Sequence, residues 1–237
     1  MVLFLRKRWI FSCITLILSA LTLVSVVRIP DTIGVSSMQT VSMNTAPVFV
    51  LDAGHGGADG GAVSTDGVYE SDINLAIIRC MWDVLSLLGC DTVLTRTDGQ
   101  SLADDPAASI RQQKVSDTQN RVALINSIDR ATLISIHQNI LPGYASVHGA
   151  QVFYSASERS AEVAETIQQT LNRVINRDNS KNKKPISADV YLMRHVTCPA
   201  VLVECGFLSN SAETERLQDP NYQTLLAMTI CCSATEG

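Results

Sequence analysis

Two histidines and two glutamates of this 237-residue chain are candidates for metal binding and acid–base catalysis. His55, His137 and Glu204 each follow a short apolar run that is typical of a strand, and Glu70 lies fifteen residues after His55. The carboxyl ends of strands in an open α/β sheet converge on one crevice, so we expect these residues to meet there. Two imidazoles and one carboxylate suit zinc with a fourth position open for water, and a spare carboxylate can move protons. This is the composition of a zinc hydrolase.

The loop that carries His55 is rich in glycine and reads LDAGHGGADGGAV. Glycine permits backbone conformations that other residues resist, which fits a close approach of the loop to a metal and a substrate. A phosphate-binding loop is a rival interpretation, but GHGGAD lacks the final glycine of G-x-G-x-x-G, and no helix is expected for about ten residues after it. A loop histidine satisfied by ordinary hydrogen bonds is the third interpretation.

Glu70 is expected at the N-terminus of a helix, on the side that faces the sheet. An apolar stripe over residues 73–88 has the 3.6-residue period of a helix, and Glu70 is three residues before Ile73. The helix N-terminus stabilises a negative charge by about 0.3–1 kcal/mol, far less than the several kcal/mol that burial of an unpaired ion costs. A cation is therefore expected beside Glu70, and Zn²⁺ is the natural one. The alternative is a carboxylate that only caps the helix.

Strand-like and helix-like segments alternate along the chain from Pro47. Short apolar runs rich in β-branched residues predict strands at residues 48–52, 92–95, 131–136, 149–155, 190–193 and 200–204. Periodic stripes and a proline suited to a first turn predict helices over residues 73–88, 109–127 and 163–174, and from Pro220 onward. The alternation predicts a single α/β domain with a mainly parallel, mixed and twisted sheet flanked by helices on both faces.

The first 28 residues are predicted to be a membrane segment that acts as a signal-anchor. Residues 9–27 are nineteen positions without a charge, which at about 1.5 Å of rise per residue span a hydrocarbon core of roughly 30 Å. Three basic residues precede this stretch, so the positive-inside rule keeps the N-terminus in the cytoplasm and exports the rest. Residues 29–46 are then a tether and residues 47–237 an exported, membrane-anchored domain; secretion after cleavage of a signal peptide is the alternative.

The exported part of the chain is acidic. The sequence has 18 Lys and Arg against 23 Asp and Glu, and four of the basic residues but none of the acidic ones lie in residues 1–28, which leaves a formal charge of −9 beyond them. This balance argues against a nucleic-acid partner. The one basic cluster, KNKKP at residues 181–185, is either a solvated loop or a loop that contacts an anion.

Six cysteines follow the membrane segment without any C-x-x-C metal spacing: Cys80, Cys90, Cys198, Cys205, Cys231 and Cys232. Cys80, Cys205 and Cys231 lie in apolar contexts, where a free cysteine behaves as a small hydrophobic residue. We therefore expect buried thiols rather than a disulfide framework.

Four segments, in this order, carry a family resemblance: LDAGHGGADGGAV, YESDINLA, SIHQN and VECGFLSN. From Pro47 to its C-terminus the chain resembles the zinc-dependent N-acetylmuramoyl-L-alanine amidases of bacterial cell walls. GAQVFYSASE followed by VECGFLSN is similar, more narrowly, to the sporulation branch, the germination-specific amidases that prepare spore cortex for muramic-lactam formation. The resemblance implies a peptidoglycan substrate, one Zn²⁺ held by His55, Glu70 and His137, and Glu204 as the catalytic acid/base.

Two other activities remain compatible with these residues. A zinc peptidase that acts within the stem peptide would share the metal chemistry. A non-catalytic wall-binding module is the other alternative, although the loss of a ligand or of Glu204 would have favoured it and none is lost. The sequence shows no internal repeat, so we expect the membrane anchor or an accessory sporulation protein to place the enzyme at the wall.

Several other side chains are expected to support the site. The family more often has a small residue at the position of Gln138, so the rim of the site is expected to differ there. Arg121 and Asn126 match positions that the family fills with Arg and Asn, and we expect buried structural hydrogen bonds from them. Asp52 is a candidate to orient a zinc-bound imidazole. The histidines expected at the surface or in support, and not as ligands, are His148 and His195.

Overall fold

The computed structural model describes residues 46–182, 184, 185 and 190–236. The predicted anchor, all but the last residue of the predicted tether, and Lys183 of the basic cluster lie outside the described residues. Within the described part of the chain, no helix is long and apolar enough to cross a membrane.

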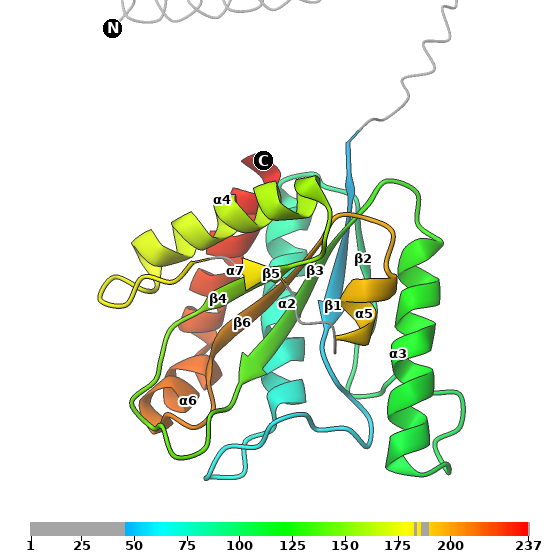
Figure 1. The fold of residues 1–237 in the computed structure, drawn as a ribbon, viewed down its shortest axis with the longest axis horizontal. Coiled ribbons are helices and arrows are strands. Elements are labelled where there is room, and N and C mark those ends of the chain that lie inside the picture. The colour runs from blue at the N-terminus through cyan, green and yellow to red at the C-terminus, as the bar shows by residue number, and fades with distance from the viewer. Residues whose placement is uncertain (1–45, 183, 186–189, 237) are drawn as a thin grey trace, which may run out of the picture. The chain divides into compact units, whose positions relative to one another are not determined.

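The described residues form a six-stranded sheet in the order β2-β1-β3-β6-β4-β5 (Figure 1). Strands β1, β2, β3 and β6 run parallel, β4 is antiparallel to β6, and β5 is parallel to β4. The strands are Val48–Ala53 (β1), Thr92–Leu94 (β2), Ala131–Asn139 (β3), Gln151–Tyr154 (β4), Lys184–Pro185 (β5) and Ala200–Phe207 (β6). The predicted α/β domain with a mostly parallel, mixed sheet is therefore confirmed.

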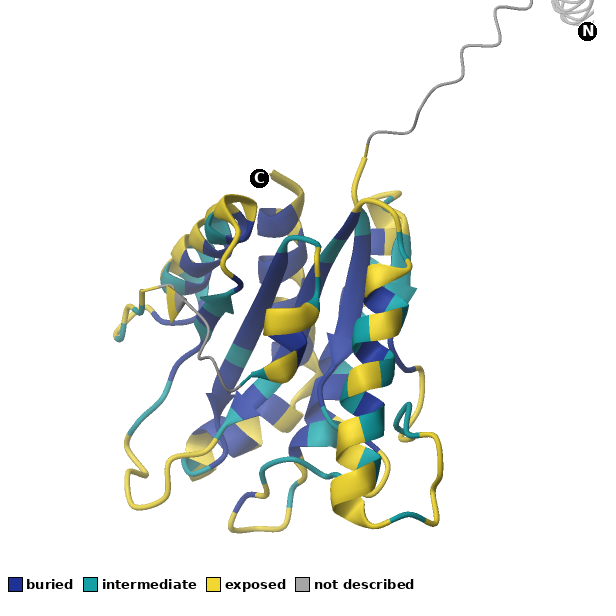
Figure 2. Ribbon diagram, turned by 45° about the vertical axis from the view of Figure 1, so that its right-hand side comes forward, coloured by how far each residue is buried: buried dark blue, intermediate teal, exposed yellow. Residues whose placement is uncertain are grey.

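Helices cover both faces of this sheet (Figures 1 and 2). One face carries α2 (Glu70–Leu87), α4 (Glu158–Val174) and α7 (Pro220–Glu236), with α6 (Ser211–Gln218) packed against α7. The other face carries α3 (Ile110–Asn126) and α5 (Tyr191–His195). Figure 2 shows the strands mostly buried between the two helical layers, whose outer faces are exposed.

Alternate residues of β1 supply the two halves of the hydrophobic core. Phe49, Leu51 and Ala53 pack into the larger half with α2, α4 and α7, whereas Val50 packs into the smaller half with α3 and α5. Successive side chains of a strand point to opposite faces of a sheet, so this division follows from the sequence. It also assigns Asp52 to the face that α3 and α5 cover.

Local sequence signals set the ends of two helices. Ser109 caps α3 through a capping box, in which its hydroxyl accepts from the backbone N–H of Gln112 while the Gln112 side chain accepts from the backbone N–H of Ser109. Ser127 follows the last residue of α3, so the predicted helix over 109–127 is confirmed to within one residue at each end. Pro220 begins α7, as its suitability for a first helical turn predicts.

The predicted strand at residues 190–193 is wrong. Tyr191–His195 form helix α5, and Leu192 and Met193 are buried in the smaller half of the core. Strand β6 is already paired with β3 on one side and with β4 on the other, so this apolar run finds no sheet edge there and packs on the face of the sheet instead. The short strand β5 and the helix α6 were not among the predicted elements.

Candidate active site

Strand alternation places four polar side chains on the face that α3 and α5 cover. Asp52 of β1, Ser135 and His137 of β3 and Glu204 of β6 each lie an even number of residues from an apolar side chain of the smaller core. The register pairs Asp52 with Ser135 and His137 with Glu204. Both strands continue past their predicted ends, so His137 lies within β3 rather than after it, and Glu204 lies in the middle of β6 rather than at its end.

His55, Glu70 and His137 come together at this edge of the sheet. The Nε2 atom of His55 and the Nδ1 atom of His137 lie 3.3 and 2.9 Å from Oε1 of Glu70. All three candidate ligand atoms lie within 4.8 Å of one another, and the two imidazole rings are inclined at 78°. Two imidazole nitrogens and one carboxylate oxygen that converge in this way fit Zn²⁺, so these residues can hold a metal ion.

Glu70 is the first residue of α2 and is only 3% exposed. Its Oε2 accepts a hydrogen bond from the backbone N–H of Ala62, and its Oε1 accepts one from the backbone N–H of Gln138. Burial opposes its ionisation, but hydrogen bonds with His137 and His55 and the charges of these rings hold the pKa of Glu70 well below its usual range. The carboxylate is therefore fixed by backbone donors and kept ionised, as a metal ligand must be.

His55 occupies a strained position in the glycine-rich loop. Its φ of 63° lies in the left-handed region that residues other than glycine rarely adopt. Its Nδ1 lies 2.8 Å from Oδ2 of Asp59, whose Oδ1 lies 2.9 Å from Nζ of Lys114. Burial lowers the pKa of His55, but hydrogen bonds with Asp59 and Glu70 outweigh burial and raise this pKa to about 9. Carboxylates at both ring nitrogens make the surroundings strongly negative, which favours a bound cation.

The expectation that Asp52 orients an imidazole is wrong, because Asp59 takes that position in the loop. Asp52 instead accepts hydrogen bonds from Arg121, Ser135 and Thr95 over 2.5, 2.6 and 2.8 Å. Burial opposes ionisation of Asp52, but the charge of Arg121 and the hydroxyl hydrogen bonds lower its pKa to about 2. Asp52 is thus a structural acid that joins β1, β3 and α3.

Two buried arginines hold the glycine-rich loop against the sheet. Arg121 donates to the backbone oxygens of His55 and Ala53 over 2.7 and 2.8 Å and pairs with Asp117, so its predicted structural role is confirmed. Arg96 also donates to the backbone oxygen of Ala53, over 2.9 Å. The sequence reasoning missed Arg96, although an arginine shortly after a strand end was the signal that pointed to it.

Glu204 lies opposite His137 in the register and lines the same cleft. Its Oε2 atom is buried and has no hydrogen-bond partner among the described residues. Burial raises the pKa of Glu204 to about 7, with the charge of Glu70 adding to this effect and the two histidines opposing it. A carboxyl group with a pKa near neutrality and a free oxygen can take up and release a proton at neutral pH.

Two glycines leave space for the candidate ligands. A Cβ atom at Gly54 would lie 2.3 Å from Cε1 of His137. A Cβ atom at Gly61 would lie 2.5 Å from Oε2 of Glu70 and 2.7 Å from Cδ2 of His55. No side chain fits so close to these atoms, and the φ of 70° at Gly61 is a second reason for glycine at that position.

Gln138 and Asn126 differ from their predicted roles. Gln138 is buried, and its amide donates to a side chain of α2 on the opposite face from His137, so the expectation that it alters the rim of the site is wrong. Asn126 makes structural hydrogen bonds with the backbone of His195 and Thr197, but it is exposed rather than buried. Both residues act on the packing of the elements around the cleft.

The remaining histidines and the cysteines do not join the ligand cluster. The ring of His195 stacks on a tyrosine of α5, and Nε2 of His148 lies 3.4 Å from an exposed aspartate. The six cysteines are free thiols in this structure. Cys205 and Cys231 are buried, whereas Cys80 is only partly buried.

Asp59 and Lys114 are further members of the site that the sequence reasoning missed. Asp59 lies four residues after His55 in the same loop, so its proximity was a local signal. Lys114 belongs to α3, and its contact with Asp59 depends on how that helix packs against the loop. The pair extends the charged network from the candidate ligands to the helix.

The cluster opens into a cleft of about 350 Å³ between the sheet and the helices α3 and α5. The cleft is lined by His55, His137 and Glu204 from the loop and the sheet and by Lys114 and Tyr191 from the helices. A candidate metal-ligand set beside a carboxyl group that can exchange a proton, at the carboxyl ends of the strands of a mostly parallel sheet, is the arrangement expected of an α/β metallohydrolase.

Comparison with known proteins identifies the family within this class. Residues 49–235 match the model of the N-acetylmuramoyl-L-alanine amidase family, so the chain belongs to that family of enzymes. The germination-specific N-acetylmuramoyl-L-alanine amidase of Bacillus subtilis (strain 168) is 35% identical over 183 residues, which cover 77% of this chain and 76% of that protein.

Solved structures agree with this assignment. The CwlD amidase from Clostridioides difficile, solved in complex with the GerS lipoprotein, matches with a TM-score of 0.76 and 36% identity over 80% of this chain and 97% of that one. The N-acetylmuramoyl-L-alanine amidase from Clostridium difficile 630 matches with a TM-score of 0.69 and 27% identity over 81% of this chain and 96% of that one. The similarity therefore extends over nearly the whole of each solved chain.

Proposed function

We propose that this amidase hydrolyses the amide between the lactyl group of N-acetylmuramic acid and L-alanine, with one Zn²⁺ held by His55, Glu70 and His137. Glu204 is the catalytic acid/base. One observation carries the proposal: beside the three converging ligand atoms lies a buried oxygen of Glu204 that has no partner among the described residues. A group that must accept a proton from one reactant and give it to another needs such a free oxygen.

The chain's own residues supply the proton transfers. When bound, the ion supplies a Lewis acid that polarises the scissile carbonyl and makes water more acidic. Glu204 accepts the proton of the attacking water at Oε2 and delivers it to the nitrogen of the departing L-alanine. A pKa of about 7 suits both transfers, because neither form of the carboxyl group is strongly preferred at neutral pH. Asp59 meanwhile holds the ring of His55 through its Nδ1 atom.

We also infer a role in the spore cortex, where the enzyme would remove stem peptides before muramic-lactam formation. Support comes from the germination-specific name of the Bacillus subtilis relative and from the similarity to CwlD. The complex of CwlD with the GerS lipoprotein motivates an accessory lipoprotein as a partner. Export through the signal-anchor at residues 1–28 would bring the domain to its substrate, whether the segment is retained or cleaved.

The products of digestion test the reaction. The zinc-loaded full chain should release peptides that begin with L-alanine from purified peptidoglycan and leave muramic acid with a free lactyl carboxylate, as seen by mass spectrometry. A Glu204→Gln protein with the same zinc content is the control and should yield at least a hundredfold less of either product, as expected for a lost acid/base. Cleavage within the stem peptide, with muramic acid still substituted, would establish the peptidase alternative instead.

A further inference from the structure

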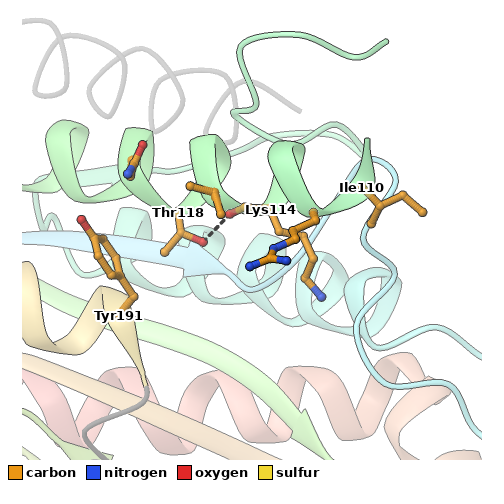
Figure 3. Close-up of a pocket in the computed structure, with 7 residues that line it drawn as sticks. Ile110, Lys114, Thr118 and Tyr191 are labelled. Atoms are coloured by element: carbon orange, nitrogen blue, oxygen red, sulfur yellow. Dashed lines mark hydrogen bonds between the residues drawn. The ribbon is translucent and has the colours of Figure 1, made fainter. Parts of the chain in front are cut away.

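A groove runs along the first half of α3, next to the active-site cleft. Its volume is about 400 Å³, and it lies between α3 and Tyr191 of α5 (Figure 3). Its α3 wall consists of Ile110, Arg111, Lys114, Val115, Thr118 and Gln119. These residues form three adjacent pairs, 110/111, 114/115 and 118/119, and each pair is four residues from the next. A spacing of four residues puts side chains on one face of the helix.

The apolar side chains of this groove are exposed and do not serve the core. Ile110 and Val115 are 57% and 52% exposed. The buried residues of α3 are a different set, Asp117, Arg121 and Ile125, which face the sheet. Exposed apolar side chains that line a hollow beside a reactive cleft indicate a binding surface.

The groove is continuous with the active-site cleft. Lys114, Thr118 and Tyr191 line both hollows. Figure 3 shows Tyr191 directed toward the helix that carries Thr118 and Lys114. The ring of His195 stacks on Tyr191 with the centroids 3.8 Å apart and an angle of 17°, which holds the tyrosine in this direction. A substrate arm that leaves the cleft on this side passes directly into the groove.

The cationic side chains of the groove indicate which part of the substrate it can bind. Lys114 already pairs with Asp59, which in turn contacts His55. Arg111 is exposed, and the described residues give it no ion pair. A guanidinium is a planar double donor that matches a carboxylate. The groove therefore offers apolar walls and an unpaired cation to whatever enters it.

We propose that this groove binds the stem peptide of the substrate, with Arg111 pairing with a peptide carboxylate and Ile110 and Val115 covering apolar side chains. The inference rests on the proposed amide cleavage, because that bond joins a glycan arm to a peptide arm. The N-acetylated sugars of the glycan arm carry no charge, whereas the stem peptide carries carboxylates from its second residue onward. The occupant is therefore an acidic peptide that begins with L-alanine.

Two soluble substrates test the groove on the zinc-loaded full chain: a disaccharide that carries L-alanine alone and one that carries L-Ala-D-Glu-diaminopimelate. The ratio of kcat/KM for the long over the short substrate measures the contribution of the stem peptide. Arg111→Gln should lower this ratio about tenfold, as expected for the loss of one charge-assisted hydrogen bond. Arg159→Gln is the matched control, because Arg159 is an exposed arginine of α4 that pairs with Glu162, and it should leave the ratio unchanged.

Val115 tests the sign of the charge effect at one exposed position. Both substitutions remove the apolar contact of Val115, but Val115→Asp also repels an acidic peptide, so Val115→Asp should lower the ratio further than Val115→Lys. Added salt should reduce the difference between the two variants, since exposed charges are screened. An equal fall of the ratio in both variants would show that charge does not select the occupant, and it would overturn the pairing with Arg111.

Two results would overturn the proposal as a whole: an Arg111→Gln ratio within twofold of the wild type, or a loss of kcat/KM confined to the short substrate. Calorimetry with the free tripeptide separates this failure from failure of the proposed function. Tripeptide binding that is weakened by Arg111→Gln, in a wild type inactive on both disaccharides, would support the groove and refute the amide cleavage. Cleavage of both disaccharides without tripeptide binding, or with equal binding by the variant, would refute the groove alone.

Discussion

Asp52 and Glu204 are carboxylates on the same face of one sheet, the first on β1 and the second on β6, and they have opposite surroundings. Asp52 accepts hydrogen bonds from three side chains, one of them the guanidinium of Arg121, and its pKa falls to about 2. Glu204 has a buried oxygen without a partner among the described residues, and its pKa rises to about 7. At neutral pH, Asp52 is therefore ionised, whereas Glu204 is close to an equal mixture of its protonated and ionised forms.

This difference separates the structural acid Asp52 from Glu204, the proposed catalytic acid. Burial of a carboxylate costs free energy unless hydrogen bonds and an opposite charge offset it. Arg121 and two hydroxyl groups offset the cost at Asp52, whereas nothing offsets it fully at Glu204. A buried carboxyl group whose pKa is near neutrality can exchange a proton with a reactant that arrives with the substrate. Partners rather than backbone position therefore set the role of each acid.

The largest effect is expected at His137, the residue that the register places opposite Glu204. His137→Ala leaves two candidate protein ligands, which rarely hold zinc, so metal and activity should be lost together. Metal analysis beside a turnover assay checks this outcome. His148→Ala is the control, because the His148 side chain is partly exposed and lies outside the cluster, and the variant should keep both metal and activity. A His137→Ala protein with one zinc per chain and full turnover would remove His137 from the ligand set.

The next effect separates the two glutamates of the cleft. Glu204→Gln cannot accept the proton of water, so turnover should fall by roughly 10²–10⁴ while zinc stays bound, and added zinc should not help. Glu70→Gln exchanges a charged ligand for a neutral amide, so zinc affinity should fall and excess zinc should restore part of the activity. Zinc titration and turnover of both variants are the measurements. Loss of zinc in Glu204→Gln but not in Glu70→Gln would exchange the two roles.

A smaller effect is expected on folding at Asp52. Asp52→Asn removes the charge that partners Arg121 and should lower the free energy of unfolding by about 3 kcal/mol, in the range found when one partner of a buried pair is removed. Urea unfolding of the full chain measures this loss. The control is Asp83→Asn on the exposed side of α2, expected to change stability by less than about 0.5 kcal/mol. Equal stabilities of the two variants would show that Asp52 is not the structural acid of the comparison.

The smallest effect is the pH dependence of this stability. The pKa of Asp52 is lowered from 3.8 to about 2, so its contribution is complete above pH 3.8 and is lost as the pH falls through 2. A shift of this size corresponds to about 2 kcal/mol. The difference in unfolding free energy between the wild type and Asp52→Asn should therefore narrow between pH 3.8 and 2. A difference that stays constant over this range would contradict the assigned shift.

The sequence was sufficient for the parts of the site that local patterns determine. The strand before His55, the strand that carries His137 and the helix that begins at Glu70 each have a clear apolar pattern, and parallel strands bring their carboxyl ends to one edge. The three residues therefore meet as expected. The alternation of side chains along β1 is a local pattern of the same kind, because it determines the face on which Asp52 lies, although it does not identify the partners of that residue.

Properties that depend on the whole fold were beyond the sequence. The apolar run at residues 190–193 has a pattern that suits a strand, and it became part of a helix because both neighbours of β6 were already in place. The contact of Lys114 with Asp59 needs α3 to pack beside the loop. The free oxygen of Glu204 depends on all the elements around the cleft, because no residue that the structure describes there supplies a donor.

Gly54 and Gly61 bear on how inactive homologues are recognised. A side chain at either position would push a candidate ligand out of place without changing any residue that binds metal or moves a proton. Gly54→Ala would therefore yield an inactive protein whose sequence still contains every candidate ligand and the proposed acid/base. A sequence signature that distinguishes active enzymes from inactive homologues should therefore include these two glycines.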